Sequence, residues 1–303
     1  MVDSCSRAMQ LLLTLLLLPV LQASNEHPHC GITPNRVAVR IEGGTLANPN
    51  DYPWMVSIQG IHNEKFEHHC GGTLITPQVV LTAAHCRSWF DKVVRARGAI
   101  RVVVGCNNHH SCSPRCHVQE FSINNWINHE HYYDYWSNFE HDIAVILLSK
   151  NVTGSRTTSP MPICMPPQDL DDYFGSSTIA GWGKDSPFLE VADINVMSAK
   201  KCSNYKKSFV KKNMICAGDE RGVSDACKGD SGGPLMVRRF TRFYQAGIVS
   251  GGKFCAVKGW NGIYTKVSRY VRWIEKHTHG YGQMQFIPLL GTSSPATTIS
   301  VSQ

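Results

Sequence analysis

The hydrophobic residues between about residues 41 and 276 come in short runs separated by turn-forming residues. Examples are the runs 100–104, 143–148 and 246–250. Runs of this length and composition, bounded by turn residues, are typical of strands rather than helices. The pattern therefore predicts an all-β architecture.

One late segment has the spacing of a helix. Four apolar residues recur at intervals of three and four positions: Val267, Tyr270, Val271 and Ile274. We therefore predict a helix over 267–276. Earlier, a stretch containing Pro160, Pro162, Pro166 and Pro167 predicts a connection between two halves, with a junction at about 150–168.

The two ends of the chain differ from this β-rich body. Residues 1–23 combine Arg7, an apolar run over 11–18 and the small residue Ala23, which is the pattern of a signal peptide. The run is shorter than the roughly 20 residues that span a bilayer. We expect a secreted protein without a membrane anchor. Residues 278–303 become rich in Gly, Ser and Thr, and we expect a disordered tail.

Composition adds two expectations. The chain has 12 cysteines, one of them in the signal segment, and an oxidising compartment favours their pairing. The net charge is +7. Basic residues gather in two stretches, Lys200, Lys201, Lys206, Lys207, Lys211, Lys212 and then Arg238, Arg239, Arg242. Such a face is suited to heparin-like glycans, although a solvated surface is the more favoured explanation.

The segment 225–234 carries the clearest candidate chemistry. It reads Asp-Ala-Cys-Lys-Gly-Asp-Ser-Gly-Gly-Pro and places Ser231 in a glycine-rich turn, two residues after Gly229. A serine hydroxyl is a weak nucleophile unless a base and an orienting carboxylate accompany it. Taken alone, the segment could be an ordinary turn.

Two further motifs supply the missing groups. Residues 81–86 offer His85, and residues 141–148 offer Asp142 at the mouth of an apolar strand. With 14 histidines and 23 acidic residues, any one of these could be structural. Their joint occurrence in the order His, Asp, Ser favours a catalytic role.

These three motifs resemble those of the trypsin-like serine proteases, which have the chymotrypsin fold. The resemblance extends over about 41–277 and implies two antiparallel six-stranded β-barrels with a C-terminal α-helix. It implies that Ser231 is the nucleophile, His85 the base and Asp142 the group that orients the base. It also implies an oxyanion hole formed by the N–H groups of Gly229 and Ser231.

The resemblance extends to the binding of substrate. Asp225 matches the carboxylate at the base of the trypsin pocket and would select Arg or Lys before the cleaved bond. Ser250, Gly252 and Gly262 match other positions at this site, the two glycines being those that keep the pocket open. Gly251 stands where the family usually has Trp, so we expect an aromatic wall to be missing.

The bond between Arg40 and Ile41 resembles the activation site of the family. Cleavage after Arg40 would free the Ile41 amine to pair with Asp230, because a buried carboxylate without a partner is costly. Residues 24–40 would then be a propeptide or light chain, and the uncut protein a zymogen. Glu42 departs from the apolar residue that is usual there.

The resemblance also implies four disulfides. They would join Cys30 with Cys164, Cys70 with Cys86, Cys202 with Cys216, and Cys227 with Cys255. Two family cysteine positions are occupied by Ser177 and Val237. Cys106, Cys112 and Cys116 remain, which leaves one bridge and one free or intermolecular thiol as the simplest outcome. This Cys- and His-rich segment fits no standard zinc pattern and lacks carboxylates for calcium, so we expect no metal and no cofactor.

The expected partners are protein or peptide substrates, an activating protease and protein protease inhibitors, with no nucleic acid. Asn151 begins a glycosylation sequon. The competing hypothesis is a weak or inactive protease homologue that binds anionic glycans through a basic face. The triad and Arg40 argue against it, whereas Gly251 and the unusual cysteine segment keep it open.

Overall fold

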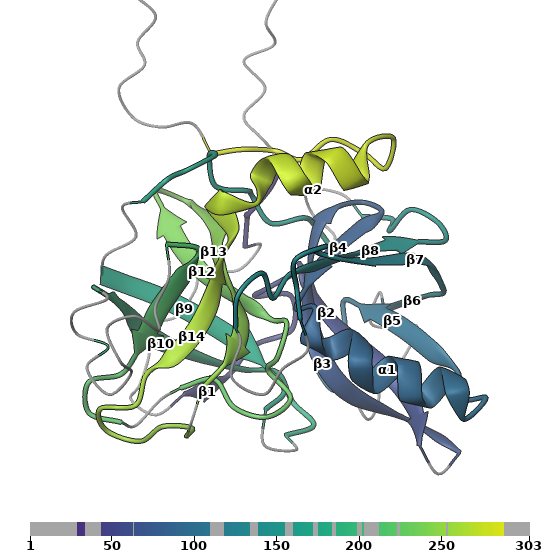
Figure 1. Ribbon diagram of the computed structural model, residues 1–303, viewed down its shortest axis with the longest axis horizontal. Coiled ribbons are helices and arrows are strands. Elements are labelled where there is room, and N and C mark those ends of the chain that lie inside the picture. Colours follow the sequence, from purple (N-terminus) through teal and green to yellow (C-terminus); the bar gives the residue numbers. More distant parts are fainter. Residues whose placement is uncertain are drawn as a thin grey trace, which may run out of the picture.

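The computed structural model describes residues 29–33, 44–62, 64–109, 118–133, 139–154, 160–171, 175–183, 186–198, 202, 212–222, 225–252 and 254–287. Two antiparallel β-sheets lie side by side, and few helices accompany them (Figure 1). The prediction of an all-β, chymotrypsin-like architecture is confirmed.

The first sheet is a curled sheet of seven strands. They are β2 (Met55–His62), β3 (Lys65–Thr76), β4 (Val79–Thr82), β5 (Ile100–Val104), β6 (Gln119–Phe121), β7 (Ile123–Asn128) and β8 (Ala144–Leu148). Their order in the sheet is β6-β5-β2-β3-β4-β8-β7. The edge strands β6 and β7 are separated in sequence only by Ser122, so the two edges are joined where the sheet curls round.

The second sheet closes on itself. Its strands are β1 (Thr45–Leu46), β9 (Gly175–Gly181), β10 (Glu190–Met197), β11 (Met214–Gly218), β12 (Pro234–Arg239), β13 (Arg242–Gly251) and β14 (Gly262–Lys266). The order is β1-β10-β11-β14-β13-β12-β9, and a further pairing of β10 with β9 completes a ring of six strands. The six-stranded barrel that we predicted is therefore present here, whereas the first half is a curled half-barrel.

The late helix is confirmed with slightly different bounds. A short 3-10 segment, η2 (Val267–Arg269), precedes α2 (Val271–Thr278). Sequence analysis did not predict α1 (His85–Arg95), although its buried residues Cys86, Phe90 and Val93 have helical spacing. None of the helices in the described part of the chain is long and apolar enough to cross a membrane.

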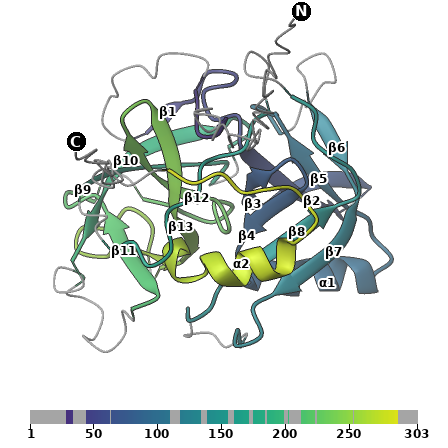
Figure 2. The same ribbon diagram turned by 90° about the horizontal axis from the view of Figure 1, so that it is seen from above.

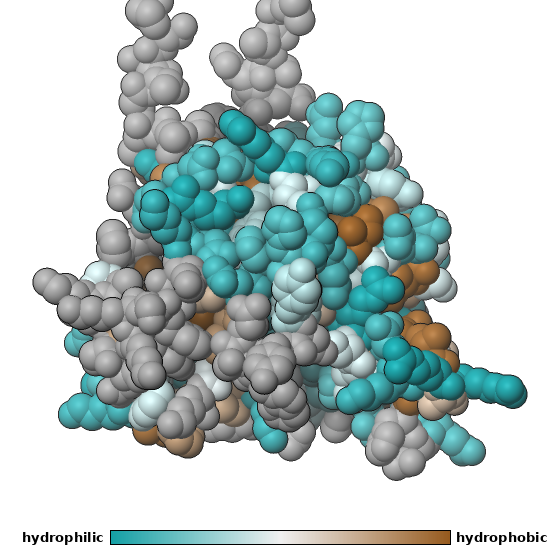
Figure 3. All heavy atoms as spheres, viewed as in Figure 1, coloured by the Kyte–Doolittle hydropathy of each residue, from teal (hydrophilic) through white to brown (hydrophobic). Residues whose placement is uncertain are grey.

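Strands β8, β11 and β14 are buried along their whole length. Every residue of β8 is buried, which explains its continuous apolar run. Trp54, just before β2, lies 5.8 Å from the Phe243 ring of β13, measured between ring centroids, so an aromatic contact links the two halves. On the face shown in Figure 3, hydrophobic residues occur in small groups among hydrophilic ones.

All four implied disulfides are present, which confirms the pairing of Cys30 with Cys164, Cys70 with Cys86, Cys202 with Cys216, and Cys227 with Cys255. Cys106 is also disulfide-bonded, to a partner outside the described residues. Ser177, at one of the two missing cysteine positions, is buried and donates its hydroxyl to the Ile194 carbonyl at 2.9 Å.

Residues 279–287, here named the C-terminal strap, run from α2 across the molecule (Figure 2). Met165 N donates to Gln285 O at 2.8 Å, and Thr76 Oγ1 donates to Tyr281 O at 2.7 Å. Ile287 is buried. The expectation of a disordered tail from residue 278 is therefore wrong for 278–287, because backbone pairing and an apolar end hold this part. Residues 288–303 lie outside the described residues.

We predict that the strap stabilises the fold. A chain ending at Thr278 should unfold with a free energy at least about 2 kcal/mol lower than a chain ending at Ile287, since it loses one buried Ile and several hydrogen bonds. Urea unfolding of the two truncated proteins measures the difference. Equal midpoints and slopes would show that the strap contributes nothing.

Candidate active site

His85 and Asp142 form a hydrogen-bonded pair at the junction of the two sheets. His85 opens α1 directly after β4, and Asp142 precedes β8. The His85 backbone N–H donates to Asp142 Oδ1 at 2.9 Å, and ring Nδ1 lies 2.7 Å from Oδ2. A carboxylate only accepts, so Nδ1 carries the proton and the Nε2 lone pair is left to act as a base.

Asp142 is also held by the second sheet. Its side chain is almost completely buried, and Ser250 Oγ on β13 donates to Oδ2 at 2.5 Å. Thr265 Oγ1 on β14 donates to the Asp142 carbonyl at 2.7 Å. Ser250 was expected to bind substrate, and its hydroxyl in the structure orients the aspartate.

Ser231 lies in a tight turn before β12. Gly229 and Gly232 in this turn have φ values of +95° and +81°, which favour glycine. Gly71 N on β3 donates to the Ser231 carbonyl at 2.7 Å. A Cβ at Gly232 would lie 2.5 Å from Gly71 O, so the close approach of the turn to the first sheet requires glycine.

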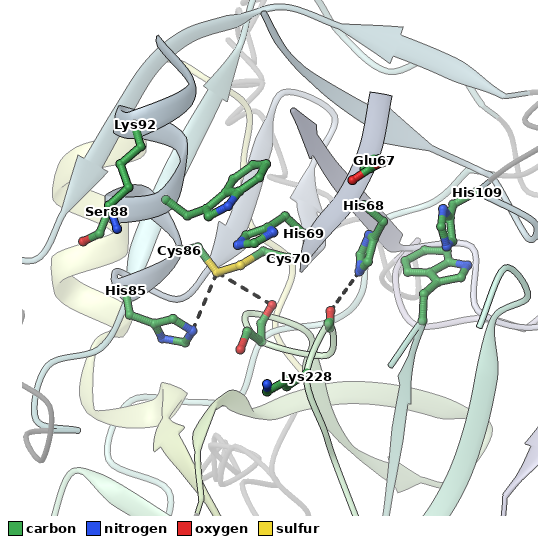
Figure 4. Close-up of a pocket in the computed structure, with 14 residues that line it drawn as sticks. Glu67, His68, His69, Cys70, His85, Cys86, Ser88, Lys92, His109 and Lys228 are labelled. Atoms are coloured by element: carbon green, nitrogen blue, oxygen red, sulfur yellow. Dashed lines mark hydrogen bonds between the residues drawn. A yellow bond between two sulfur atoms is a disulfide. The ribbon is translucent and has the colours of Figure 1, made fainter. Parts of the chain in front are cut away.

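The Cys70–Cys86 disulfide lies beside His85 (Figure 4). Cys86 Sγ is 3.9 Å from His85 Nε2 and 3.8 Å from Ser231 O. Cys70, His85 and Cys86 lie close enough to suggest a metal site. Both sulfurs are bonded to each other, however, so they cannot act as thiolate ligands.

His68 is a residue that sequence reasoning missed. Its Nε2 donates to the Gly229 carbonyl at 2.8 Å, and its Nδ1 accepts from Ser57 Oγ at 2.8 Å. Burial lowers the pKa of His68 to about 3, so the ring is neutral and keeps one donor and one acceptor. His68 therefore holds the peptide unit between Gly229 and Asp230, which lies between the two candidate oxyanion donors, the N–H groups of Gly229 and Ser231. No sequence pattern marks it.

Asp225 lies in a confined site. Burial raises the pKa of its carboxyl to about 7, and the Ala226 N–H donates to Oδ1 at 2.8 Å. A Cβ at Gly262 would lie 3.0 Å from the same oxygen, so the structure brings Gly262 and Asp225 together. Gly252 is exposed at the end of β13.

Asp230 is packed against two glycines. Its Oδ2 accepts from Cys227 N at 2.8 Å, and Cβ atoms at Gly181 and Gly183 would lie 2.0 and 2.4 Å from its carboxylate oxygens. Arg40 and Ile41 lie outside the described residues, so the expected pairing of Ile41 with Asp230 stays a prediction.

An aromatic ring packs beside Gly251. A Cβ at Gly251 would lie 2.3 Å from Cε1 of Phe139, which belongs to the loop before β8. Gly251 therefore leaves room for a ring from a distant segment, and the expected absence of an aromatic wall beside the substrate backbone stays a prediction.

The fold and this arrangement of histidine, buried aspartate and serine define a serine protease with the chymotrypsin-like fold. The model of the trypsin family matches residues 41–274, and the chain belongs to that family. It is similar to coagulation factor IX of Cavia porcellus, with 31% identity over 249 residues, which cover 79% of this chain and 82% of the relative.

We predict that Gly251→Ala destabilises the fold only because the Phe139 ring lies beside it. The methyl group should displace the ring and lower the free energy of unfolding by about 1 kcal/mol or more, as overpacking does. The same change in a Phe139→Ala background should cost much less. Urea unfolding of the wild type, the two single variants and the double variant gives the coupling energy between positions 251 and 139. If the two changes lower the free energy of unfolding additively, the contact is contradicted.

Proposed function

We propose that this protein is a secreted endopeptidase, made as a zymogen and activated by cleavage after Arg40, that hydrolyses bonds after Arg or Lys. The observation that carries the proposal is that His85, paired to buried Asp142, and Ser231 line one pocket. Protein inhibitors and an activating protease are the partners that this function requires.

The proposed chemistry is an acyl-enzyme mechanism. Ser231 Oγ attacks the scissile carbonyl while His85 Nε2 takes its proton, and His85 later returns that proton to the leaving amine. Asp142 keeps His85 in the required tautomer. The N–H groups of Gly229 and Ser231 stabilise the oxyanion, a contribution of about 10²–10³ in rate for each such donor. A water molecule then attacks the acyl-enzyme ester. His85 takes a proton from this water and returns it to Ser231 Oγ, which releases the acid product.

The environment of Asp225 supports selection of a cation. Its raised pKa shows that burial disfavours the charged carboxylate. A guanidinium or ammonium group of the substrate would compensate for this desolvation by a charge-assisted hydrogen bond. Gly262 supports the same role, since any side chain there would crowd Oδ1.

The surroundings of Asp230 support activation by a new amino terminus. Its carboxylate adjoins the nucleophile turn, and an Ile41 ammonium would provide a countercharge that orders this turn. The Cys30–Cys164 disulfide would keep the light chain attached after cleavage. Asn151 is exposed and available for the proposed glycosylation.

The proposal is tested by cutting the protein after Arg40 and offering fluorogenic peptides that differ in the residue before the cut. We expect cleavage after Arg and Lys, labelling of Ser231 by a fluorophosphonate, no labelling of Ser231→Ala, and no activation of Arg40→Gln. A cut protein that is neither labelled nor active, yet binds heparin tightly, would favour the inactive homologue.

A second prediction concerns pH. The pKa of Asp225 is raised, so the carboxyl is neutral below about pH 7 and charged above it. Affinity for benzamidine, whose cation is permanent in this range, should rise with pH and level off above about 7, with proton release on binding below that point. Titration calorimetry in two buffers measures both effects.

The matched variant for this prediction is Asp225→Ser. It should bind benzamidine at least about a hundredfold more weakly, because the cation is left without a partner, and should lose the pH dependence. Affinity that is flat between pH 5 and 8 in the wild type would show that benzamidine does not contact Asp225.

A further inference from the structure

Ser231 lines a pocket of about 870 Å³. We name it the leaving-side pocket. Its lining includes His69, His85, Trp89, Lys92, Lys228 and Ser231. Figure 4 shows Lys92 and Ser88 on α1 above His85, with Lys228 on the opposite side. This volume is in the range of pockets that enclose a ligand.

The position of the pocket decides which part of a substrate enters it. Among the described residues that line it, neither Asp225 nor Gly262 appears. On the proposed function, the residue before the scissile bond points toward Asp225. We therefore assign the chain after that bond to the leaving-side pocket, which Ser231 and His85 both line.

One face of α1 forms a wall of this pocket. His85, Ser88, Trp89 and Lys92 are spaced by three and four residues, so all of them lie on one side of the helix. Trp89 stacks on His69 with ring centroids 3.4 Å apart and planes 13° apart. The wall thus combines the flat aromatic surface of Trp89 and His69 with the ammonium group of Lys92, which lies about one helical turn further along α1.

Two lysines bring positive charge to the pocket, whereas two of its histidines are neutral. Burial lowers the pKa of His69 to about 4 and that of His68 to about 3, so both rings are neutral near pH 7. Lys92 and Lys228 are exposed, and neither makes an ion pair with a carboxylate of the described residues. Glu67 contributes the one acidic side chain of the lining.

We infer that the leaving-side pocket selects polypeptides that carry acidic residues just after the scissile bond, with Lys92 and Lys228 as the determinants. The inference rests on the proposed function and extends it to the other side of the cleaved bond. An extended chain advances about 3.3 Å per residue, so side chains at the second and third positions reach the region beyond Ser231 that the two lysines flank.

The test compares two peptides that are identical up to an Arg and then carry either Glu or Lys at the second and third following positions. The cut wild-type protein should have a kcat/KM about tenfold higher for the acidic peptide, as two partly exposed charge contacts allow. The ratio should shrink in about 0.5 M salt. Equal rates, or a preference for the basic peptide, would overturn the inference.

Charge-reversal variants test whether Lys92 and Lys228 are the determinants of this selectivity. Lys92→Glu and Lys228→Glu should each reduce the ratio, and the double variant should invert it. The matched control is Lys276→Glu, which reverses an exposed charge on α2 and should keep the wild-type ratio. A ratio that is the same in all of these variants would contradict the assignment of the two lysines.

Two further measurements separate this inference from the proposed function. A small Arg ester has no residues after the bond, so failure of the wild-type protein to hydrolyse it would refute the proposed function. Binding of the two peptides to Ser231→Ala, cut and uncut, is measured by calorimetry and needs no catalysis. Equal affinities there would overturn the inference whatever the activity, and tighter binding of the acidic peptide would support it.

Discussion

The buried carboxylate of Asp142 is the interaction on which the site depends. A carboxylate removed from water is tolerated only when donors surround it. The donors here come from both halves of the molecule: the backbone and ring of His85 from the first, and Ser250 Oγ from β13 of the second. Thr265 adds a bond to the carbonyl of the same residue. The barrel must therefore pack correctly on the curled sheet for Asp142 to orient His85. A misplaced barrel would leave the buried charge of Asp142 without the hydrogen bond from Ser250.

A reciprocal link holds the nucleophile. Ser231 belongs to the second half, but its carbonyl accepts from Gly71 of β3, and the Cys70–Cys86 disulfide lies against it. Each half thus fixes a reacting group that the other half carries. The glycines of the turn follow from this requirement, since only residues without a Cβ permit such close approach at positive φ. His68 extends the same link to Gly229.

These links explain what the sequence could and could not predict. The fold class, the pairing of His85 with Asp142 and the four disulfides follow from local motifs or from a family pattern. Helix α1 was also predictable, since Cys86, Phe90 and Val93 have helical spacing. The hydrogen bond from His68 to Gly229 spans 161 residues, and the packing of Phe139 on Gly251 likewise joins distant segments. The strap was missed because composition says nothing of the backbone groups that Met165 offers to residue 285.

The charges that flank Ser231 are opposite in sign on its two sides. On the proposed function, half-buried Asp225 would face the residue before the scissile bond, whereas Lys92 and Lys228 would border the side where the following segment leaves. Such an arrangement discriminates twice: it attracts a chain whose charge runs from positive to negative across the bond, and it repels one with the reverse order. Repulsion matters most at Asp225, where low polarity strengthens electrostatics, and least at the exposed lysines, where water and salt screen it. On the proposed function, the pocket of Asp225 would therefore govern which residue is cut, and the leaving-side pocket would rank the sequences that share this residue.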